Sequence, residues 1–465
     1  MGNNSSQNSG NSSDKAEAFL KPRISKPPLS PKEFFKYLGP AFIFTATQIG
    51  GGEFITVPLM GAYLGMTGIY LTPIIAFIKV FGQFYLVQYG VIRGKTFLKT
   101  CWDKKWLRWM FFCLMAGCII HSMLLAGLLG QIAGTINYLI PISNEIWILI
   151  IMIIAFSIVV TRSYNLLEKI SSVLLWIFLT LITIVAILFW PSLEQWIIGF
   201  TPQLPGAIEG LETTSGIMTV AVLFVVLGAG FGPTVSYIWF AKDKKMGMFE
   251  PYENGFELNP EDLTEEETRR LDGWKKVILY QNLVSALILT FFSMFIWIAA
   301  AQTLHVQGYK PVGWELIPQM ESIFTLTYGK WSGLLFIICG AVALFSSILG
   351  PLYGFSRLWE ESLEQFGLYS KVNIKKENVY RICLAFFASL PMIFIFITGK
   401  PMWLFSIASM LSGPILGLLY IIPIPLTYIE MKENAPDLKP TRYWAIMLAL
   451  FSGVLMIILS LVGLG

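Results

Sequence analysis

One carboxylate follows three consecutive glycines inside an apolar stretch of this chain, Gly50 to Gly52 and then Glu53. The apolar run that contains them, Tyr37 to Tyr63, is long enough to cross a bilayer, which takes about 20 residues. Glycines lower helix propensity, so we expect the helix to unwind here. Unwound backbone at membrane depth is tolerated where it is buried in protein or lines a cavity, and a carboxylate in hydrocarbon is costly. These residues therefore mark a candidate functional site. The structural alternative is a glycine-packed helix with Glu53 near one end.

A lysine occupies the middle of the second apolar run, Ile69 to Val91. Lys79 is too deep for its side chain to reach the membrane surface easily. If its ammonium faces the site, it repels a divalent cation and attracts an anion. A purely structural contact of Lys79 with Glu53 or with a backbone carbonyl is an open alternative.

A second interruption falls in the sixth apolar run, Gly216 to Phe240, which reads Gly-Ala-Gly-Phe-Gly-Pro from Gly228 to Pro233. Breaks at matching positions of two halves indicate an inverted-repeat transporter with its site at the membrane midplane. Unwinding would expose the N-termini of two half-helices, whose free N–H groups and positive dipole ends bind anions. Gln48 and Thr234 would add hydrogen bonds to such a site.

Composition places the chain among the polytopic membrane proteins, because 55% of its 465 residues are hydrophobic and only 13% are charged. No sizeable soluble domain fits between the apolar runs. Eleven spans are predicted, and the eight not yet named are Leu107–Leu139, Ile146–Val160, Leu166–Trp190, Val277–Ala301, Leu334–Tyr353, Val379–Ile397, Trp403–Tyr428 and Trp444–Leu464. We therefore expect an all-α polytopic membrane protein.

Basic residues are distributed unevenly between the two sides of these spans. Nearly all Lys and Arg fall in the N-terminal tail and in the connections after the even-numbered spans, whereas the opposite connections carry only Lys310, Lys330 and Lys400. By the positive-inside rule, we expect a cytosolic N-terminus and an extracellular C-terminus in the cell (plasma) membrane. No role is assigned to the cytosolic connection 243–274.

Several short motifs resemble the NRAMP family of metal-ion transporters. Leu38-Gly39-Pro40, the broken helix that follows and the later Gly61-Ala62-Tyr63-Leu64-Gly65 look like the opening of that family. Gly232-Pro233-Thr234 followed by Tyr237 is similar to the family's second broken helix, and the likeness runs from about Lys36 through the eleventh span. The resemblance implies the LeuT-type fold, with spans one to five and six to ten as inverted repeats and one extra helix.

The implied organisation is one transporter domain behind a polar tail. Residues 1–35 are rich in Asn, Ser, Lys and Pro, and we expect them to be a disordered cytosolic tail. The single transmembrane domain covers 36–465, with a first repeat at 36–190, a second repeat at 214–428 and the extra helix at 443–464.

The residues of the metal site differ from the family's pattern. The family's Asp-Pro-Gly-Asn on the first span is replaced here by Gly50-Gly51-Gly52-Glu53, and its Met-Pro-His on the sixth by Gly232-Pro233-Thr234. The family's metal-binding Asp, Asn and Met therefore fall on Gly50, Glu53 and Gly232, and a Gln of the tenth span falls on Ser412. A soft thioether and a hard carboxylate together select transition metals, and both are missing at their usual places.

The family's proton-carrying positions differ as well. Family members move protons through acidic residues on the third span and histidines on the sixth. These positions align here with Leu128 and Gln131, and with Thr234 and Trp239. The resemblance therefore implies a divergent member with another substrate.

We expect a secondary active transporter that imports a small anion such as bicarbonate by alternating access, coupled to Na⁺. The predicted substrate-binding residues are Gln48, Gly50, Gly51, Gly52, Lys79, Gly232 and Thr234. The predicted coupling-ion residues are Glu53, Ser346 and Ser347, since hard oxygen ligands suit Na⁺. Two alternatives stay open: a transporter of a divalent metal cation, Mg²⁺ or Mn²⁺, with Glu53 as its surviving ligand, and a transport-dead sensor.

The expected partners are the lipid bilayer and the small inorganic ion, without nucleic acid and without a cofactor other than bound Na⁺. Both histidines are isolated and the five cysteines lack metal-ligand spacing, which argues against a metal site built from these residue types. The sequence shows no nucleotide loop and no nucleophile–base pairing, so no enzyme activity is predicted. It leaves the oligomeric state open.

Overall fold

The computed structural model describes residues 23–50, 52–209, 213–253, 263–311, 329–367, 374–431 and 442–464, together with Gln319, Glu321, Thr325 and Leu438. All regular elements within these ranges are helices. The prediction of an all-α fold is therefore confirmed.

The first half of the chain contains a broken helix and four further spans. The broken helix consists of α3 (Gly39–Gln48), the π-helical turn η1 (Gly52–Thr56) and α4 (Val57–Leu64). The spans that follow are α5 (Leu71–Arg93), α7 (Arg108–Leu139), α8 (Asn144–Val159) and α9 (Tyr164–Leu188). The short helices of this half are α2 (Pro31–Lys36), α6 (Phe97–Asp103), η2 (Lys105–Leu107) and α10 (Leu193–Phe200).

The second half repeats this pattern around a second broken helix. That helix consists of α11 (Gly216–Val226) and α12 (Phe231–Asp243), and the short helix α13 (Phe249–Glu253) follows it. The remaining elements are α14 (Glu265–Ala300) with its π-helical extension η5 (Ala301–His305), α16 (Lys330–Gln365), α18 (Lys376–Thr398), α19 (Pro401–Ile421), α20 (Pro423–Met431) and α21 (Tyr443–Val462).

Length and hydropathy make these helices membrane spans. Within the described ranges, nine helical stretches are long and apolar enough to cross a bilayer, and α8 is a shorter apolar helix. The broken segment α3–η1–α4 is the remaining predicted span. Each of the predicted apolar runs therefore coincides with helix, and the chain is a polytopic membrane protein.

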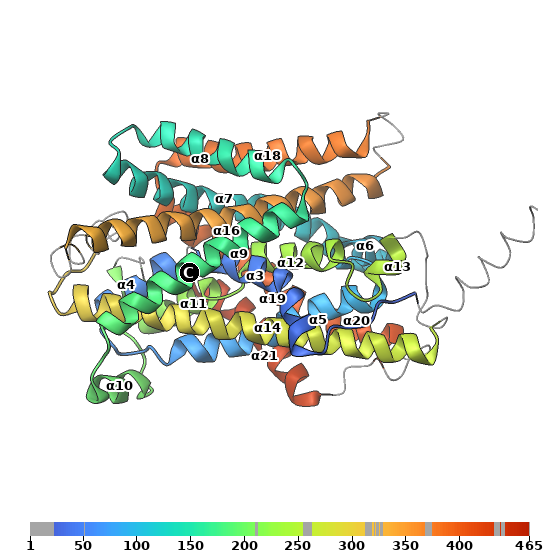
Figure 1. Ribbon diagram of the computed structural model, residues 1–465, viewed down its shortest axis with the longest axis horizontal. Helices are drawn as coiled ribbons and strands as arrows, with labels where there is room; N and C mark the ends of the chain where they lie inside the picture. The colour runs from blue at the N-terminus through green and yellow to red at the C-terminus, as the bar shows by residue number, and fades with distance from the viewer. Residues whose placement is uncertain are drawn as a thin grey trace, which may run out of the picture.

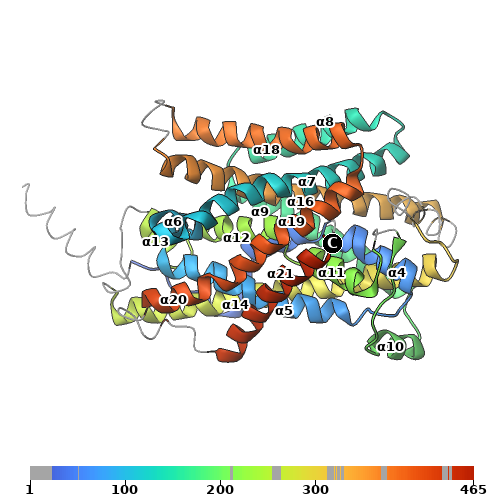
Figure 2. The ribbon, with the colours of Figure 1, turned by 180° about the vertical axis from the view of Figure 1, so that it is seen from behind.

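The two broken helices lie in the interior of the bundle (Figure 1). α3 packs against α9, α12, α14 and α16, whereas α11 packs against α19 and α21. α8 and α18 run side by side along one long edge, next to α7 and α16. α21 crosses the face that is seen from behind (Figure 2). Both breaks are thus enclosed by other helices.

Two helices extend further than the apolar runs predict. α14 begins at Glu265, where Thr264 and Glu267 form a capping box, and it continues into the seventh span without a break. α16 continues to Gln365, past the predicted end at Tyr353. Hydropathy detects only the membrane part of such helices, because their polar extensions are stabilised by capping and by ion pairs rather than by lipid.

The last third of the predicted tail is placed against α13 and α14. The guanidinium of Arg23 donates to Glu267 at 2.9 Å, and the backbone N–H of Ser25 donates to Glu250 at 2.7 Å. The indole of Trp274 donates to the Ser25 carbonyl at 3.0 Å. The expectation of a disordered tail over 1–35 is therefore corrected for residues 23–35, whose polar groups find partners far along the chain; residues 1–22 lie outside the described part.

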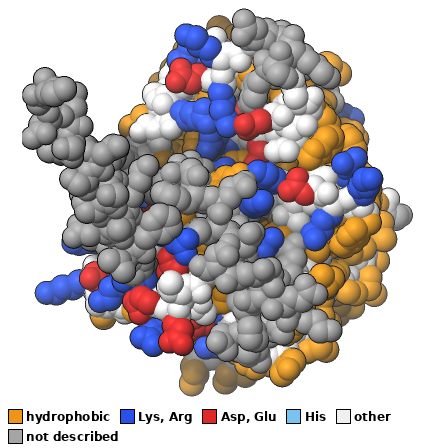
Figure 3. Space-filling view, turned by 90° about the vertical axis from the view of Figure 1, so that its right-hand side faces the viewer, with side chains coloured by type: hydrophobic (Ala, Val, Ile, Leu, Met, Phe, Trp, Pro, Cys, Tyr) orange, Lys and Arg blue, Asp and Glu red, His pale blue; other side chains and the backbone are white. Residues whose placement is uncertain are grey.

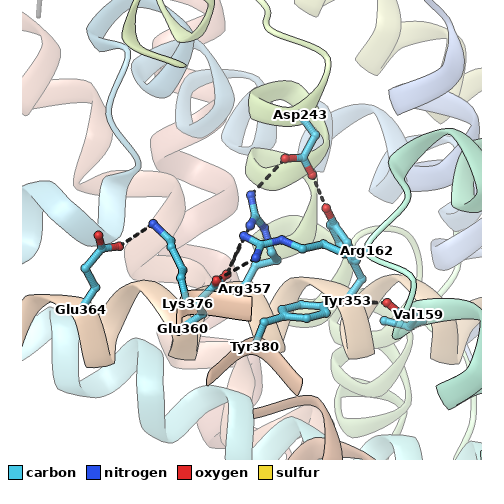
Figure 4. Close-up of polar contacts among 9 residues, drawn as sticks. All are labelled: Val159, Arg162, Asp243, Tyr353, Arg357, Glu360, Glu364, Lys376 and Tyr380. Atoms are coloured by element: carbon cyan, nitrogen blue, oxygen red, sulfur yellow. Dashed lines mark hydrogen bonds and ion pairs between the residues drawn. The ribbon is translucent and has the colours of Figure 1, made fainter. Parts of the chain in front are cut away.

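Charged side chains gather at the end of the bundle where α6 and α13 lie (Figure 3). An ion network at this end joins α12 to α16 (Figure 4). Arg357 of α16 bonds Asp243 of α12 at 3.0 Å and Glu360 at 3.2 Å. Arg162 reaches Glu360 at 3.0 Å, and Tyr353 donates a hydrogen bond to Asp243. The second half of span six is thereby tied to span eight.

Candidate functional site

Both broken spans are interrupted where the glycines lie. α3 ends at Gln48 and η1 begins at Gly52, whereas α11 ends at Val226 and α12 begins at Phe231. In the second break Gly228 has φ +76°, a left-handed conformation that L side chains rarely adopt. The predicted discontinuity of spans one and six is therefore confirmed.

The glycines of the first break are also required by close packing. A Cβ on Gly50 would lie 2.0 Å from the Oγ of Ser347, and a Cβ on Gly52 would lie 2.2 Å from the carbonyl oxygen of Val226. Since both distances are far below van der Waals contact, any larger residue would separate the first break from α16 and from α11.

Glu53 joins the two breaks. Its side chain is fully buried. The carboxylate accepts the Gly228 N–H at 2.7 Å and the Gly50 N–H at 3.4 Å. The Gly50 N–H also donates to the Gln48 carbonyl at 2.7 Å, so its bond to Glu53 is the weaker of the two. The Glu53 carboxylate thus accepts backbone N–H groups from both broken spans.

Lys79 of α5 caps the end of α11. Its ammonium is buried and donates to the carbonyl oxygens of Leu227 at 2.6 Å, Phe224 at 3.1 Å and Val225 at 3.3 Å. The last carbonyls of a helix have no partner within the helix and form its negative end, so a cation is favourable there. All three ammonium donors are used. Lys79 and Glu53 form no ion pair within 4.0 Å. Instead, Lys79 donates to the Leu227 carbonyl and Glu53 accepts from the neighbouring Gly228 N–H, so both side chains bond the backbone of the second break.

A cavity of about 50 Å³ lies between the two breaks. This volume accommodates roughly a small ion and one or two waters, at about 10–15 Å³ for each water. The start of α12 contributes Gly230, Phe231 and Pro233 to its wall. The polar side chains that line it, among the described residues, are Thr47, Gln48, His121, Ser347, Ser409 and Ser412.

The predicted site residues fall into separate groups. Those that line the cavity are Gln48, Gly52 and Ser347. Those that bond backbone groups around the breaks are Lys79, Glu53 and Ser346, the last of which donates to the Ala46 carbonyl at 2.8 Å. Those in the first turn of α12 are Gly232 and Thr234. Gly50 packs against Ser347, and Gly51 lies outside the described residues.

His121 is the cavity residue that sequence reasoning missed. In the sequence it is an isolated histidine, yet its imidazole is buried in the cavity wall contributed by α7. The available signal was a titratable side chain in the middle of an apolar helix, which by itself marks a candidate functional residue.

Comparison with known proteins identifies the family. A family model described as natural resistance-associated macrophage protein-like (Nramp) matches residues 41–464. The chain belongs to the Nramp family. The resemblance predicted from the motifs is therefore confirmed.

Solved structures share the fold of this Nramp protein. A mutant of the manganese transporter of Eremococcus coleocola aligns with a TM-score of 0.70 over 96% of this chain and 90% of its own, at 11% identity. MhsT in complex with L-phenylalanine gives a TM-score of 0.59 over 94% of this chain and 100% of its own, at 15% identity. At such low identities the likeness establishes the fold alone.

An uncharacterized protein of Pasteurella multocida is 24% identical over 400 residues, which are 83% of this chain and 84% of that protein. Family and fold together make this Nramp protein a multi-pass membrane protein and a secondary transporter.

Proposed function

We propose that this Nramp protein carries a small anion, such as bicarbonate, by alternating access. The observation that supports an anion is the lining of the cavity between the two breaks. Its polar part consists of hydroxyl, amide and imidazole groups and the N-terminus of α12, and apolar side chains make up the rest. No acidic side chain lines it in the described part of the chain. Hydrogen-bond donors and the positive end of a helix dipole favour an anion.

The charges beside the cavity disfavour a divalent cation. Carbonyl oxygens at unwound helix ends coordinate cations in transporters of this architecture. Here the ammonium of Lys79 occupies the oxygens of Phe224, Val225 and Leu227. Glu53 is bonded to backbone N–H groups. A divalent cation would have to displace Lys79 before it found enough oxygen ligands.

We propose Na⁺ as the coupling ion, in a plasma membrane with the N-terminus on the cytosolic side. Ser347 lines the cavity and Ser346 contacts the Ala46 carbonyl of α3, so both hydroxyls border the first break. These oxygens suit a hard monovalent cation. Glu53 adds negative charge at the same break.

A divalent metal cation is the second candidate, and the comparisons favour it over the anion. The Eremococcus coleocola neighbour is a manganese transporter, and a second structure of it, with an aromatic bis-isothiourea compound, gives a TM-score of 0.68 at 13% identity. Within the site, Glu53 keeps one carboxylate and His121 adds an imidazole, a ligand that suits transition metals. A conformation in which Lys79 leaves the carbonyl oxygens would complete a cation site.

Uptake into proteoliposomes distinguishes these candidates. Purified protein is reconstituted, and uptake of radiolabelled bicarbonate and of radiolabelled Mn²⁺ is measured with and without an inward Na⁺ gradient. We expect Na⁺-dependent bicarbonate uptake and Mn²⁺ uptake no higher than in protein-free liposomes. Mn²⁺ uptake without bicarbonate uptake would refute the anion proposal. Folded protein that takes up neither ion would favour a transport-dead sensor.

A further inference from the structure

We propose that His121 contacts the transported ion and recognises a protonated oxyanion, one that carries both acceptor oxygens and an O–H group. This inference rests on the proposed transport of a small anion and assigns a recognition residue to it. The residue lies on α7, which contributes no predicted site residue.

His121 is held in the cavity wall by aromatic rings. Its side chain is 2% exposed. The ring lies edge-on to Phe355 of α16, with centroids 5.7 Å apart, and tilted against Phe231 of α12 at 5.9 Å. These contacts fix the plane of the imidazole without using its nitrogens. These two ring contacts therefore occupy neither nitrogen with a hydrogen bond.

The imidazole also lacks a protein partner. Its Nδ1 is buried and has no hydrogen-bond partner among the described residues. A buried polar group left without a partner is destabilising, and native structures keep such groups mainly where a water, an ion or a ligand satisfies them. A cavity beside the ring supplies the space for such a ligand.

One glycine in the first turn of α12 makes room for the ring. A Cβ on Gly232 would lie 2.6 Å from the Nε2 of His121, so no other residue fits at this position without displacing the imidazole. A Cβ on Gly230 would lie 3.9 Å from its Cε1, an ordinary van der Waals contact, so Gly230 borders the ring without being required by it. The ring therefore packs directly on the backbone of the half-helix whose first residues line the cavity. In the proposed site, His121 and the N-terminus of α12 contact the same ligand.

This pairing suits a protonated oxyanion. A neutral imidazole presents one N–H donor and one nitrogen acceptor. Backbone N–H groups at the helix start are donors only, and they match acceptor oxygens. The imidazole can both donate to an oxygen and accept from an O–H group, which an amide N–H alone cannot do. Bicarbonate has this combination of groups.

The test compares two replacements of His121 in reconstituted protein. His121→Leu removes both nitrogens, whereas His121→Gln keeps a donor and an acceptor. We expect His121→Leu to raise the KM for bicarbonate at least about tenfold, because the variant loses one buried hydrogen bond to the ion. The maximal rate should change little. We expect His121→Gln to stay within about threefold of wild type.

His305 provides the matched control. It is the other histidine of the chain, and it lies at the end of η5, where its ring bonds the Ala62 carbonyl at 3.0 Å. His305→Gln should leave KM unchanged. A folded His121→Leu variant with wild-type KM would overturn the proposal, and so would a His121→Gln variant as impaired as His121→Leu.

A second variant keeps the test decisive if His121→Leu fails to fold. Gly232→Ala should displace the ring and raise KM, and adding it to His121→Gln should raise KM by less than the product of the separate effects. Independent effects would overturn the proposal.

If wild-type protein takes up Mn²⁺ and not bicarbonate, the anion function fails. The same variants then measure whether His121 contacts Mn²⁺, and an unchanged KM for Mn²⁺ would overturn the contact as well.

Discussion

Replacing Lys79 by methionine removes the ammonium that bonds three carbonyl oxygens at the end of α11. The three bonds, at 2.6, 3.1 and 3.3 Å, are buried. Each carbonyl left without a partner costs about 1–3 kcal/mol, although the costs at one site are not additive. Loss of one member of a buried set of charges typically costs about 3–5 kcal/mol. We expect Lys79→Met to lower the free energy of unfolding by about this amount.

Glu53 contributes a second, smaller effect because its carboxylate loses a compensating charge. No ion pair within 4.0 Å joins Lys79 and Glu53. At an effective dielectric constant of about 20, two unit charges beyond this distance attract each other by less than about 4 kcal/mol. The double variant Lys79→Met/Glu53→Gln removes this effect but leaves the carbonyl oxygens unbonded. We expect it to regain about 1–2 kcal/mol over the single variant, without reaching the wild-type stability.

The assay combines thermal unfolding in detergent, at one heating rate, with bicarbonate uptake at matched folded yield. Lys99→Met is the control, because Lys99 donates to Tyr252 at 2.6 Å in the half-buried polar end of the bundle, where we expect about 1 kcal/mol or less. Both Lys79 variants should lose uptake. Full uptake and wild-type stability in the double variant would refute the assignment of Lys79 to the site.

Three further predictions concern the groups around the two breaks and the ion network. Glu53→Gln should reduce the Na⁺ dependence of uptake by a larger factor than it raises the KM for bicarbonate. Equal changes in Na⁺ dependence and KM would contradict a coupling role. Gly228→Ala should cost about 1–2 kcal/mol in thermal unfolding, because its φ of +76° strains any L side chain, and an unchanged melting midpoint would contradict this. Arg357→Met should speed amide hydrogen exchange at the end of α12, because it removes the 3.0 Å link to Asp243; unchanged exchange would show that the link does not hold α12.

Local patterns were sufficient to predict the spans and the breaks. Helix propensity and hydropathy depend on residues close together in the chain, so the glycines at Gly50–Gly52 and near Gly228 indicated both interruptions before any contact was known. The same locality explains the errors at helix ends. The polar beginning of α14 and the polar end of α16 are stabilised by caps and ion pairs, which hydropathy does not report.

The contacts of the buried charges were decided by the tertiary structure alone. The sequence shows that a buried lysine needs a partner, and it left open whether Lys79 faces Glu53, a carbonyl or an anion. The fold brings to Lys79 a carbonyl oxygen 148 residues away, and to Glu53 an N–H group 175 residues away.

His121 shows the same limit. In the sequence it is a titratable residue in an apolar helix, which marks it as a candidate, but nothing near it indicates which ligand it would bind. It becomes a cavity residue because α7 packs where Gly232 leaves room for the ring. The sequence by itself determines which residues are too polar for the membrane interior and where helices must break. Which polar groups meet across those breaks depends on helix packing, because their partners are far apart in the chain and adjacent only after folding.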